Sequence, residues 1–354
     1  MGRRTSVVVA ALALLLGACA REEVPAAPEL RVAATPDAES LLLSEGAVVL
    51  LGVAGITADT VVLADSRSTR RAIEVGDVDL VVAYSGEEWL TRLGRADPPA
   101  DPLEAFPVLA ESDLGRGLTW LIPAGGPGED PGGTGGAGGS GGPAGPAGPA
   151  GPGAEGPPAN ATFAFFVAGP PSIDADLRSI SQLSLRLSER PELSLCVDAE
   201  FGRRADGLSA LLSTYSVRRD RPFLAAGPEE VVGRVRAGDC VAGLSHATDG
   251  RAWAAGMLPL VDDLRFFPAF VPAPVVRTGT LLADVRVGPA LAPMGELTTA
   301  LLGRANGAVT AGAGIEQTAE ELAGRLLERL DARRGDLDGP DGPDGPDGSE
   351  EGAR

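Results

Sequence analysis

Apolar and polar positions alternate in blocks along most of the chain. Short apolar runs, several of them rich in β-branched residues, are each followed by a longer stretch with helical spacing. The predicted strands are residues 30–34, 60–64, 78–84, 162–168, 193–201 and 238–245, and the predicted helices are residues 38–51, 68–74, 85–94, 174–188 and 207–215. Apolar strands separated by helices are typical of parallel sheets covered on both faces, so the pattern predicts an α/β protein.

Helix-capping patterns refine two of these elements. Ser85 is expected to cap a helix whose first turn holds Glu87 and Glu88. Near the other end of the chain, Thr318 and Glu321 have the spacing of a capping box. The helix predicted there, residues 318–334, places three leucines on one face: Leu322, Leu326 and Leu330.

Two stretches of low complexity interrupt the pattern. Residues 125–159 consist mainly of glycine and proline, and an acidic DGP repeat follows residue 335. Such compositions cannot bury enough apolar surface to fold, so both stretches are predicted to be disordered. The first is interpreted as an insertion into a surface loop. The remaining chain, within 354 residues that are 44% hydrophobic, is long enough for two lobes.

The charge balance excludes one class of partner. The chain has 30 basic residues, all arginine, against 49 acidic residues, which gives a formal net charge of -19. Binding to nucleic acid requires a basic face that neutralises phosphates, so no nucleic-acid partner is expected. A single histidine and three cysteines also make a poor ligand set, and neither a metal nor a cofactor is predicted.

The N-terminus has the features of an export signal. Arg3 and Arg4 precede an apolar run from Val7 to Leu16, which as a helix rises only about 15 Å and is too short to span a bilayer. The sequence LGAC that ends at Cys19 resembles the bacterial lipobox, which implies cleavage before Cys19 and lipidation of its sulfur. The alternative is an ordinary secretory signal in which this cysteine is incidental. Either reading places the mature protein outside the cytoplasm.

Cys196 and Cys240 remain once Cys19 is assigned to the N-terminal signal. Both lie in apolar runs that are predicted to be strands. In an oxidising compartment two cysteines on adjacent strands can form a disulfide, but the sequence does not give the Cα separation that a disulfide requires. A disulfide and two buried thiols therefore both remain open.

Several motifs together resemble one family. TDGR at residues 248–251 and DDLRFFPAFVPAPVVR at 262–277 are similar to a segment of the substrate-binding proteins of osmoprotectant ABC transporters, the OpuAC/ProX-like family, which bind glycine betaine, choline and carnitine. Three further stretches match in the same order: residues 68–94, the pair 118–124 and 160–167, and residues 199–216. The resemblance covers most of the chain from Leu30 to about Leu330.

This resemblance implies a two-lobed fold of the type II periplasmic-binding-protein class, with the ligand in the cleft between the lobes. The implied domains are a lipoprotein signal peptide (1–18), a tether (19–29), a discontinuous first lobe (30–124 and 271–332), the insertion (125–159), a second lobe (160–270) and an acidic tail (333–354). The implied crossings between lobes lie near residues 162–167 and 270–274. The protein is expected to be a monomer, anchored to a membrane by lipid and delivering its ligand to an ABC transporter permease.

The resemblance also implies an aromatic cage. A quaternary ammonium has no N–H group to donate, so proteins surround it with ring faces. Tyr84 matches a cage tyrosine, whereas Phe163 and Phe270 stand where relatives have tyrosines, and His246 lies close to another aromatic position. For His246 the alternative is an ordinary structural role. Two other rings in the same segment, Phe266 and Phe267, are expected in the core.

At the carboxylate end of the implied ligand this sequence departs from its relatives. Arg204 matches the family's carboxylate-binding arginine, with its neighbour Arg203 as the alternative. Glu87, however, replaces a threonine that helps to hold the carboxylate, and residues 34–40 lack the lysine that relatives carry there. Either Glu87 points away from the ligand, or the ligand has a hydroxyl group or a second cation in place of the carboxylate.

The predicted function is therefore capture of a quaternary ammonium osmoprotectant for an ABC importer. The alternative is a surface lipoprotein of the same fold whose pocket no longer serves transport. An enzyme is not expected, because the chain has no Ser-His-Asp order, phosphate loop or HExxH motif. The paired acids Asp262 and Asp263 are interpreted as a solvated turn.

Overall fold

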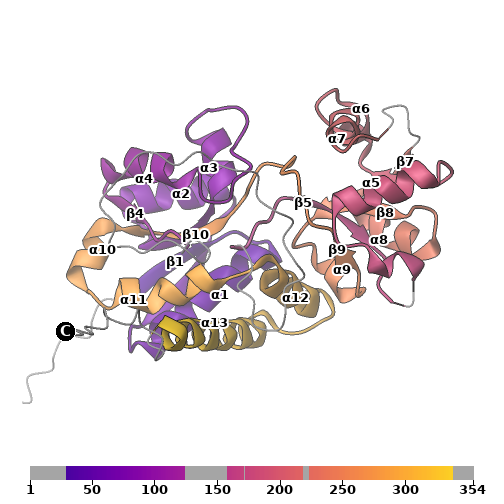
Figure 1. Cartoon of the computed structure of the whole chain (residues 1–354). Helices are drawn as coiled ribbons and strands as arrows, with labels where there is room; N and C mark the ends of the chain where they lie inside the picture. Colours follow the sequence, from indigo (N-terminus) through magenta and orange to yellow (C-terminus); the bar gives the residue numbers. More distant parts are fainter. Residues whose placement is uncertain (1–28, 124–157, 171, 218–222, 338–354) are drawn as a thin grey trace, which may run out of the picture.

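The computed structural model of the 354-residue chain describes residues 29–123, 158–170, 172–217 and 223–337. These residues form two lobes, each built around one five-stranded sheet (Figure 1). The N-terminal signal, most of the predicted insertion and the acidic tail lie outside the described residues.

The first sheet has the strand order β2-β1-β3-β10-β4. Its strands are β1 (Leu30–Ala34), β2 (Ala58–Val62), β3 (Leu80–Tyr84), β4 (Leu118–Trp120) and β10 (Pro272–Arg277). Strands β2, β1 and β3 run parallel, whereas β10 is antiparallel to both of its neighbours. The helices of this lobe are α1 (Ala38–Val53), α2 (Ser66–Val75), α3 (Ser85–Thr91), α4 (Phe106–Leu114), α10 (Thr278–Ala283), α11 (Val287–Leu291), η2 (Ala292–Glu296), α12 (Thr299–Thr310) and α13 (Ile315–Leu337).

The second sheet has the corresponding order, β7-β6-β8-β5-β9. Its strands are β5 (Phe163–Val167), β6 (Leu195–Val197), β7 (Phe223–Ala225), β8 (Ala242–His246) and β9 (Leu258–Pro259). Here β7, β6 and β8 run parallel and β5 is antiparallel to its neighbours. The helices of this lobe are η1 (Ile173–Asp176), α5 (Ile180–Glu189), α6 (Ala199–Arg203), α7 (Leu208–Thr214), α8 (Pro228–Ala237) and α9 (Gly250–Ala254).

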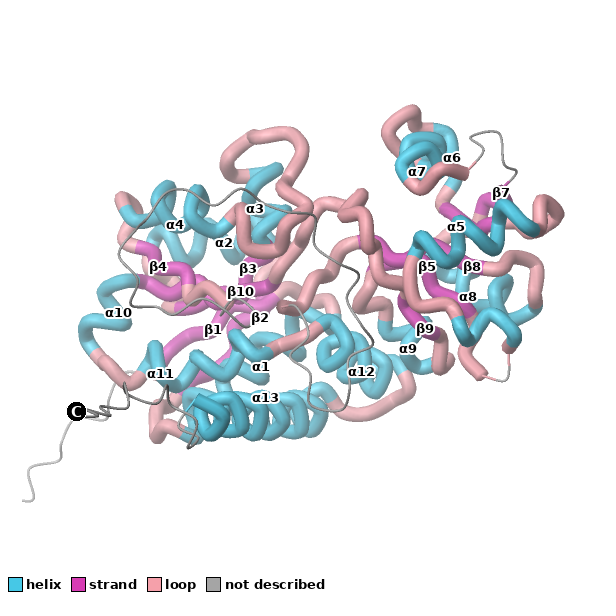
Figure 2. Tube along the Cα trace, in the orientation of Figure 1, coloured by secondary structure: helices cyan, strands magenta, loops and turns pink. Residues whose placement is uncertain are grey.

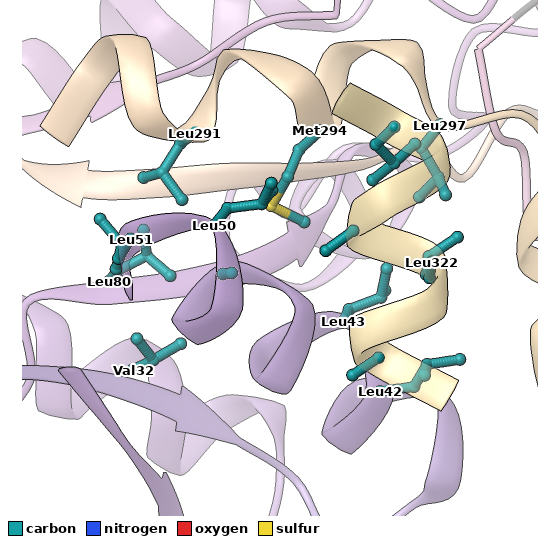
Figure 3. Packing of buried hydrophobic residues seen from close by; sticks show 14 of the residues in the cluster. Val32, Leu42, Leu43, Leu50, Leu51, Leu80, Leu291, Met294, Leu297 and Leu322 are labelled. Carbon is teal, nitrogen blue, oxygen red and sulfur yellow. The ribbon is translucent and has the colours of Figure 1, made fainter. Parts of the chain in front are cut away.

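The central strands of both sheets are buried on two faces, which explains why they are largely apolar rather than alternating, whereas the edge strands β2 and β7 are partly exposed. In β1, Val32 packs on one side with α1, α12 and α13, and the neighbouring Ala33 packs on the other side with Phe106. Figure 3 shows the first of these clusters, in which leucines of α1 meet Leu291, Met294, Leu297 and Leu322. In β5, Phe165 and Phe166 divide between two clusters in the same way. The chain therefore forms an α/β two-lobed fold, as predicted.

The two segments that connect the lobes lie side by side (Figure 2). The amide of Ala161 donates to the carbonyl of Phe270 over 2.9 Å, and the hydroxyl of Thr162 donates to the carbonyl of Pro268 over 2.6 Å. Asn160 adds a side-chain acceptor, because its Oδ1 receives the amide of Phe270 at 2.7 Å. These bonds fasten the two connections into one paired hinge.

Several local predictions need correction. Ser85 is the first residue of α3 rather than its cap, and its hydroxyl instead accepts the amide of Val271 at 3.0 Å. Thr318 lies inside α13, which begins at Ile315, and its hydroxyl donates to the carbonyl of Gly314. The strand predicted over residues 193–201 ends at Val197, because Asp198 caps α6 by accepting the amides of Glu200 and Phe201. The helix predicted over 174–188 divides into η1 and α5.

The predicted insertion has one folded end. Ala159, its last residue, is 2% exposed in the cluster around α1, and its amide donates to the carbonyl of Leu297. Pro158 forms an isolated bridge with Thr298. Residues 124–157 lie outside the described residues, so the insertion itself stays a prediction.

Candidate ligand-binding site

A cavity of about 360 Å³ opens at the carboxyl edge of the first sheet. Its walls come from the segments that follow β1, β2 and β3 and from the first turns of α1, α2 and α3. Ligands in open α/β sheets bind at this edge, where the loops after parallel strands converge. The cavity is therefore the candidate site of the first lobe.

Tyr84 ends β3 and lines the cavity. Its hydroxyl donates a hydrogen bond to Oε1 of Glu39, which lies in the first turn of α1. Burial raises the pKa of Tyr84 well above its usual value, and the carboxylates of Glu39, Asp37 and Glu87 raise it further. The phenol therefore stays neutral and acts as a donor, with its ring next to a set of negative charges.

Glu87 also lines the cavity, where its Oε1 accepts a hydrogen bond from the hydroxyl of Ser66. The carboxylate of Glu87 is therefore part of the cavity wall. Three more acids share the same walls: Asp37, Asp65 and Glu88. The lining is strongly acidic.

The one cation of the lining, Arg70, is already engaged. Its guanidinium binds the carboxylate of the fully buried Asp113 in two parallel bonds, and its Nε lies 2.9 Å from Glu74. Burial favours the neutral form of Asp113, but the hydrogen bonds from Arg70 and Trp120 outweigh this effect and hold the pKa of Asp113 below its usual range. Removing Arg70 from this pair would leave a buried charge, so the guanidinium is not available to a ligand carboxylate.

Side chains occupy two of the three helix N-termini next to the cavity, whereas α3 has no side-chain cap. Asp37 caps α1 by accepting the amide of Ser40 at 2.9 Å, and Asp65 caps α2 by accepting the amide of Ser68 at 2.7 Å. The hydrogen bonds from Ser68 lower the pKa of Asp65, which keeps this cap ionised. An N-terminus normally attracts anions, but here side chains of the protein fill that role. Among the described walls of the cavity, the N-terminus of α3 is the one helix end without a side-chain cap, and Glu87 and Glu88 in its first turn place negative charge beside it.

Phe270 lies at the hinge, next to the start of α3. A Cβ on Gly86 would come within 2.8 Å of the Phe270 ring and 2.5 Å of the carbonyl of Ala269, so this contact requires glycine. The ring is partly exposed. Because Pro272 pairs with Tyr84 in the sheet, Phe270 is two residues from the partner of the cavity tyrosine.

The second lobe presents a cluster of rings at its own carboxyl edge. Phe163, which is 40% exposed, faces His246 across the β5–β8 pair, and the two rings stack with their centroids 4.8 Å apart. The ring centroids of Phe267 and Phe201 lie 5.9 and 6.4 Å from the ring centroid of Phe163. The Nδ1 atom of His246 lies 3.2 Å from the carbonyl of Ala161 in the hinge. We call these four residues the aromatic cluster.

Arg204 is placed differently from what the resemblance implies. Its guanidinium lies on the surface and pairs with Asp206 through bonds of 3.0 and 2.8 Å. The same pairing raises the pKa of Arg204. Half of its side chain is exposed, and it joins neither the cavity nor the aromatic cluster.

The structure thus sorts the predicted site residues into two half-sites. Tyr84 and Glu87 lie in the acidic cavity, Phe163 and His246 in the aromatic cluster, and Phe270 at the hinge. The sequence analysis missed three contributors: Glu39, Phe201 and Asn160. Phe201 lies in α6, in the segment that follows β6, although the sequence predicted it inside the strand over residues 193–201. Nothing local marks Glu39 or Asn160.

Cys196 and Cys240 form a disulfide with their Cα atoms 5.7 Å apart, while Cys19 lies outside the described residues. Within the described ranges, no cluster of three or more histidine, cysteine or acidic residues has the arrangement of a metal site. No helix in the same ranges combines the length and apolar character needed to cross a membrane.

Comparison with known proteins agrees with this architecture. A family model described as the substrate-binding domain of the ABC-type glycine betaine transport system (OpuAC) matches residues 154–325. The chain is 26% identical over 265 residues to the glycine betaine-binding protein YehZ of Escherichia coli, covering 72% of this chain and 76% of that protein. It is 24% identical over 221 residues to a glycine-betaine-binding protein of Pseudomonas aeruginosa, covering 60% of each.

Solved structures give the same result for the fold. The apo structure of YehZ from Escherichia coli superposes with a TM-score of 0.67 at 23% identity, covering 86% of this chain and 99% of that one. A structure described as a glycine betaine/carnitine/choline ABC transporter superposes with a TM-score of 0.66 at 20% identity, covering 85% of this chain and 100% of that one. The fold is that of a type II periplasmic binding protein. The resemblance to the substrate-binding proteins of osmoprotectant ABC transporters is confirmed.

Proposed function

We propose that this protein is the extracytoplasmic substrate-binding component of an ABC importer, and that it captures a quaternary ammonium compound without a carboxylate. Choline is the simplest such compound. The observation that carries the proposal is the cavity beside Tyr84, whose walls hold four acids and no free cation among the described residues. A permanent cation gains from both the ring and the surrounding negative charge.

The same acids disfavour glycine betaine. A ligand carboxylate about 5 Å from Glu87 would be destabilised by about 3 kcal/mol at an effective dielectric constant of about 20, which is more than a hundredfold in affinity. A hydroxyl group has the opposite effect, because it can donate a hydrogen bond to a carboxylate. The acidic lining therefore distinguishes choline from betaine although both have the same trimethylammonium head.

In this proposal the second lobe supplies the remaining rings. Phe163 and His246 stand at the edge of the second sheet next to the hinge, where closing of the lobes would bring them toward the cavity. Ligand capture by hinge closure is common in binding proteins of this architecture. The cation would then lie between the ring of Tyr84 and that of Phe163.

A ligand panel tests this function. The melting temperature of the purified protein is measured with choline, glycine betaine, carnitine, ectoine and tetramethylammonium. We expect choline and tetramethylammonium to raise it and glycine betaine to raise it less. If none of the five compounds changes the melting temperature, the alternative function, a surface lipoprotein of the same fold without a transport role, replaces this one.

We also propose that the protein is tethered to the outer face of a membrane through Cys19, on the strength of the LGAC motif. Cys19→Ser should release the protein from the membrane fraction or leave an uncleaved precursor. Recovery of the wild-type protein entirely in the soluble fraction would contradict the anchor.

A further inference from the structure

Helix α12 touches both lobes. Leu301, Leu302 and Ala305 on one side of α12 are buried in the cluster that also contains α1 and α13. The other side packs against α9, which follows β8 of the second sheet and precedes β9. Besides the two covalent connections of the hinge, the lobes are therefore joined by a packed contact between helices.

Glycines on both helices make this contact close. A Cβ on Gly303 would lie 2.1 Å from Nε1 of Trp253, and a Cβ on Gly307 would lie 3.0 Å from Cβ of the same tryptophan. On the α9 side, a Cβ on Gly250 would lie 2.5 Å from the backbone oxygen of Asn306. Any larger side chain at Gly250 or Gly303 would push the two helices apart.

Asn306 is a polar side chain within this contact, and it is 7% exposed. Its Nδ2 donates to Oε2 of Glu39 over 2.5 Å and to the carbonyl of Thr248 over 3.0 Å. Both partners are acceptors, so the orientation of the amide is fixed. Glu39 in turn accepts the hydroxyl of Tyr84, and Thr248 follows His246 by two residues.

One hydrogen-bonded chain therefore runs from Tyr84 through Glu39 and Asn306 to Thr248. It begins at the acidic cavity and ends on the turn that follows β8, whose last residue is His246 of the aromatic cluster. The Oδ1 atom of Asn306 is buried and has no hydrogen-bond partner in the described part of the chain. Such an unpaired acceptor lowers the folding stability by about 1–3 kcal/mol. If packing were the only requirement at this position, an apolar residue of similar shape would therefore be more stable.

We propose that Asn306 is a positioning residue that couples the two half-sites. It holds Glu39, and through Glu39 the ring of Tyr84, in a position that depends on where α9 and the turn at Thr248 lie. A movement of the second lobe at this contact is thereby transmitted to the cavity of the first. The inference rests on the proposed function in one respect, namely that Tyr84 contacts the ligand.

The test uses three variants of the full-length protein. Asn306→Leu removes both hydrogen bonds at similar volume. The double substitution Glu39→Gln with Asn306→Asp exchanges amide and carboxylate, which restores the bond between positions 39 and 306 but leaves an oxygen facing the carbonyl of Thr248. Thr310→Val is the matched control, because Thr310 lies on the same side of α12 close to Gly250.

The two ends of this hydrogen-bonded series, Tyr84 and the turn at Thr248, are observed separately and without ligand. The protein has two tyrosines, so carbon-13 labelling of the tyrosine Cζ atoms gives one signal for Tyr84 and one for Tyr215, whose hydroxyl donates to Asp262. Amide hydrogen exchange of residues 245–254 reports on the turn at Thr248. Asn306→Leu should shift the Tyr84 signal but not that of Tyr215, and should accelerate exchange in residues 245–254 about tenfold or more.

Choline titration gives the functional result. Asn306→Leu should weaken choline binding about tenfold, the double substitution should recover most of that loss while exchange at residues 245–254 stays fast, and Thr310→Val should change neither. An unchanged Tyr84 signal in Asn306→Leu would overturn the coupling, and so would equally weak binding in Asn306→Leu and the double substitution. If the wild-type protein binds no choline but both ends still respond, the coupling stands and the proposed function fails.

Discussion

The two sheets share one strand order but end in opposite chemistry at their carboxyl edges. The edge of the first sheet is a cavity lined by acids and one tyrosine, whereas the edge of the second carries Phe163, His246, Phe201 and Phe267. The same edge of the two corresponding sheets thus carries acidic side chains in the first lobe and aromatic rings in the second. In the proposed function these are the two requirements of a quaternary ammonium, divided between two lobes.

The lobes also differ in how they are held together. The second lobe has a disulfide between Cys196 and Cys240, which are 44 positions apart and both buried, whereas the first lobe has the carboxylate–arginine group around Asp113. The disulfide constrains the unfolded chain, while the ion pairs act only in the folded state. The following changes therefore separate the two lobes, beginning with the largest expected effect.

Replacing Cys196 and Cys240 together by alanine should destabilise the second lobe selectively. A loop of 44 residues corresponds to about 4 kcal/mol in the chain-entropy description of a disulfide. Hydrogen exchange should become faster in peptides of β5, β6 and β8 and stay unchanged in β1 and β3. An equal loss of protection in both sheets would show that the lobes unfold as one unit.

Glu87→Thr should strengthen the binding of glycine betaine by up to about a hundredfold, because it removes a repulsion of about 3 kcal/mol. Choline binding should stay the same or weaken. Isothermal titration of both ligands measures this, and Glu111→Thr, an exposed acid on α4, is the matched control. If betaine affinity is the same in both variants, Glu87 does not act on the ligand.

Tyr84→Ala should weaken choline binding about thirtyfold, since a desolvated cation–π contact contributes about 2 kcal/mol. Phe163→Ala should have a smaller effect in the same direction, because 40% of this side chain is exposed. Tyr84→Phe keeps the ring and should retain most of the affinity. Titration of the three variants compares the half-sites directly, and a larger loss in Phe163→Ala than in Tyr84→Ala would reverse their ranking.

Arg204→Ala should change the affinity for glycine betaine by less than about twofold, because Arg204 pairs with the exposed Asp206 on the surface and lies in neither the cavity nor the aromatic cluster. This is the smallest expected effect, and it separates the structure from the role that the resemblance implies. A tenfold loss in the same titration would mean that Arg204 leaves Asp206 and joins the ligand when the lobes close.

The fold could be predicted from the sequence because the hydrophobic pattern that indicates it recurs in many elements along the chain. Strand after strand is apolar, the helices between them have one apolar face, and the corrections at Ser85 and Thr318 move a helix start by a few residues without altering the topology. The disulfide could not be decided from the sequence, since it depends on the distance between Cys196 in β6 and Cys240, which lies two residues before β8.

The site was less predictable because it depends on contacts between distant segments. Tyr84 and Glu87 are marked by their places at the end of a strand and just after it, but Glu39 reaches Tyr84 only through the packing of α1 beside β3. Asn306 lies 267 positions from Glu39 in a helix whose apolar residues gave no hint of a polar contact. No local pattern distinguishes such a residue from any other asparagine in a helix.

The measurement that tests the account most directly is the relative affinity of the wild-type protein for choline and glycine betaine, obtained by isothermal titration under one set of conditions. The two ligands share the trimethylammonium head and differ in the group that meets the acidic cavity. We expect choline to bind in the micromolar range and glycine betaine at least about tenfold more weakly. Tighter binding of glycine betaine than of choline would contradict the assignment of the acidic cavity as the part of the site that selects the ligand.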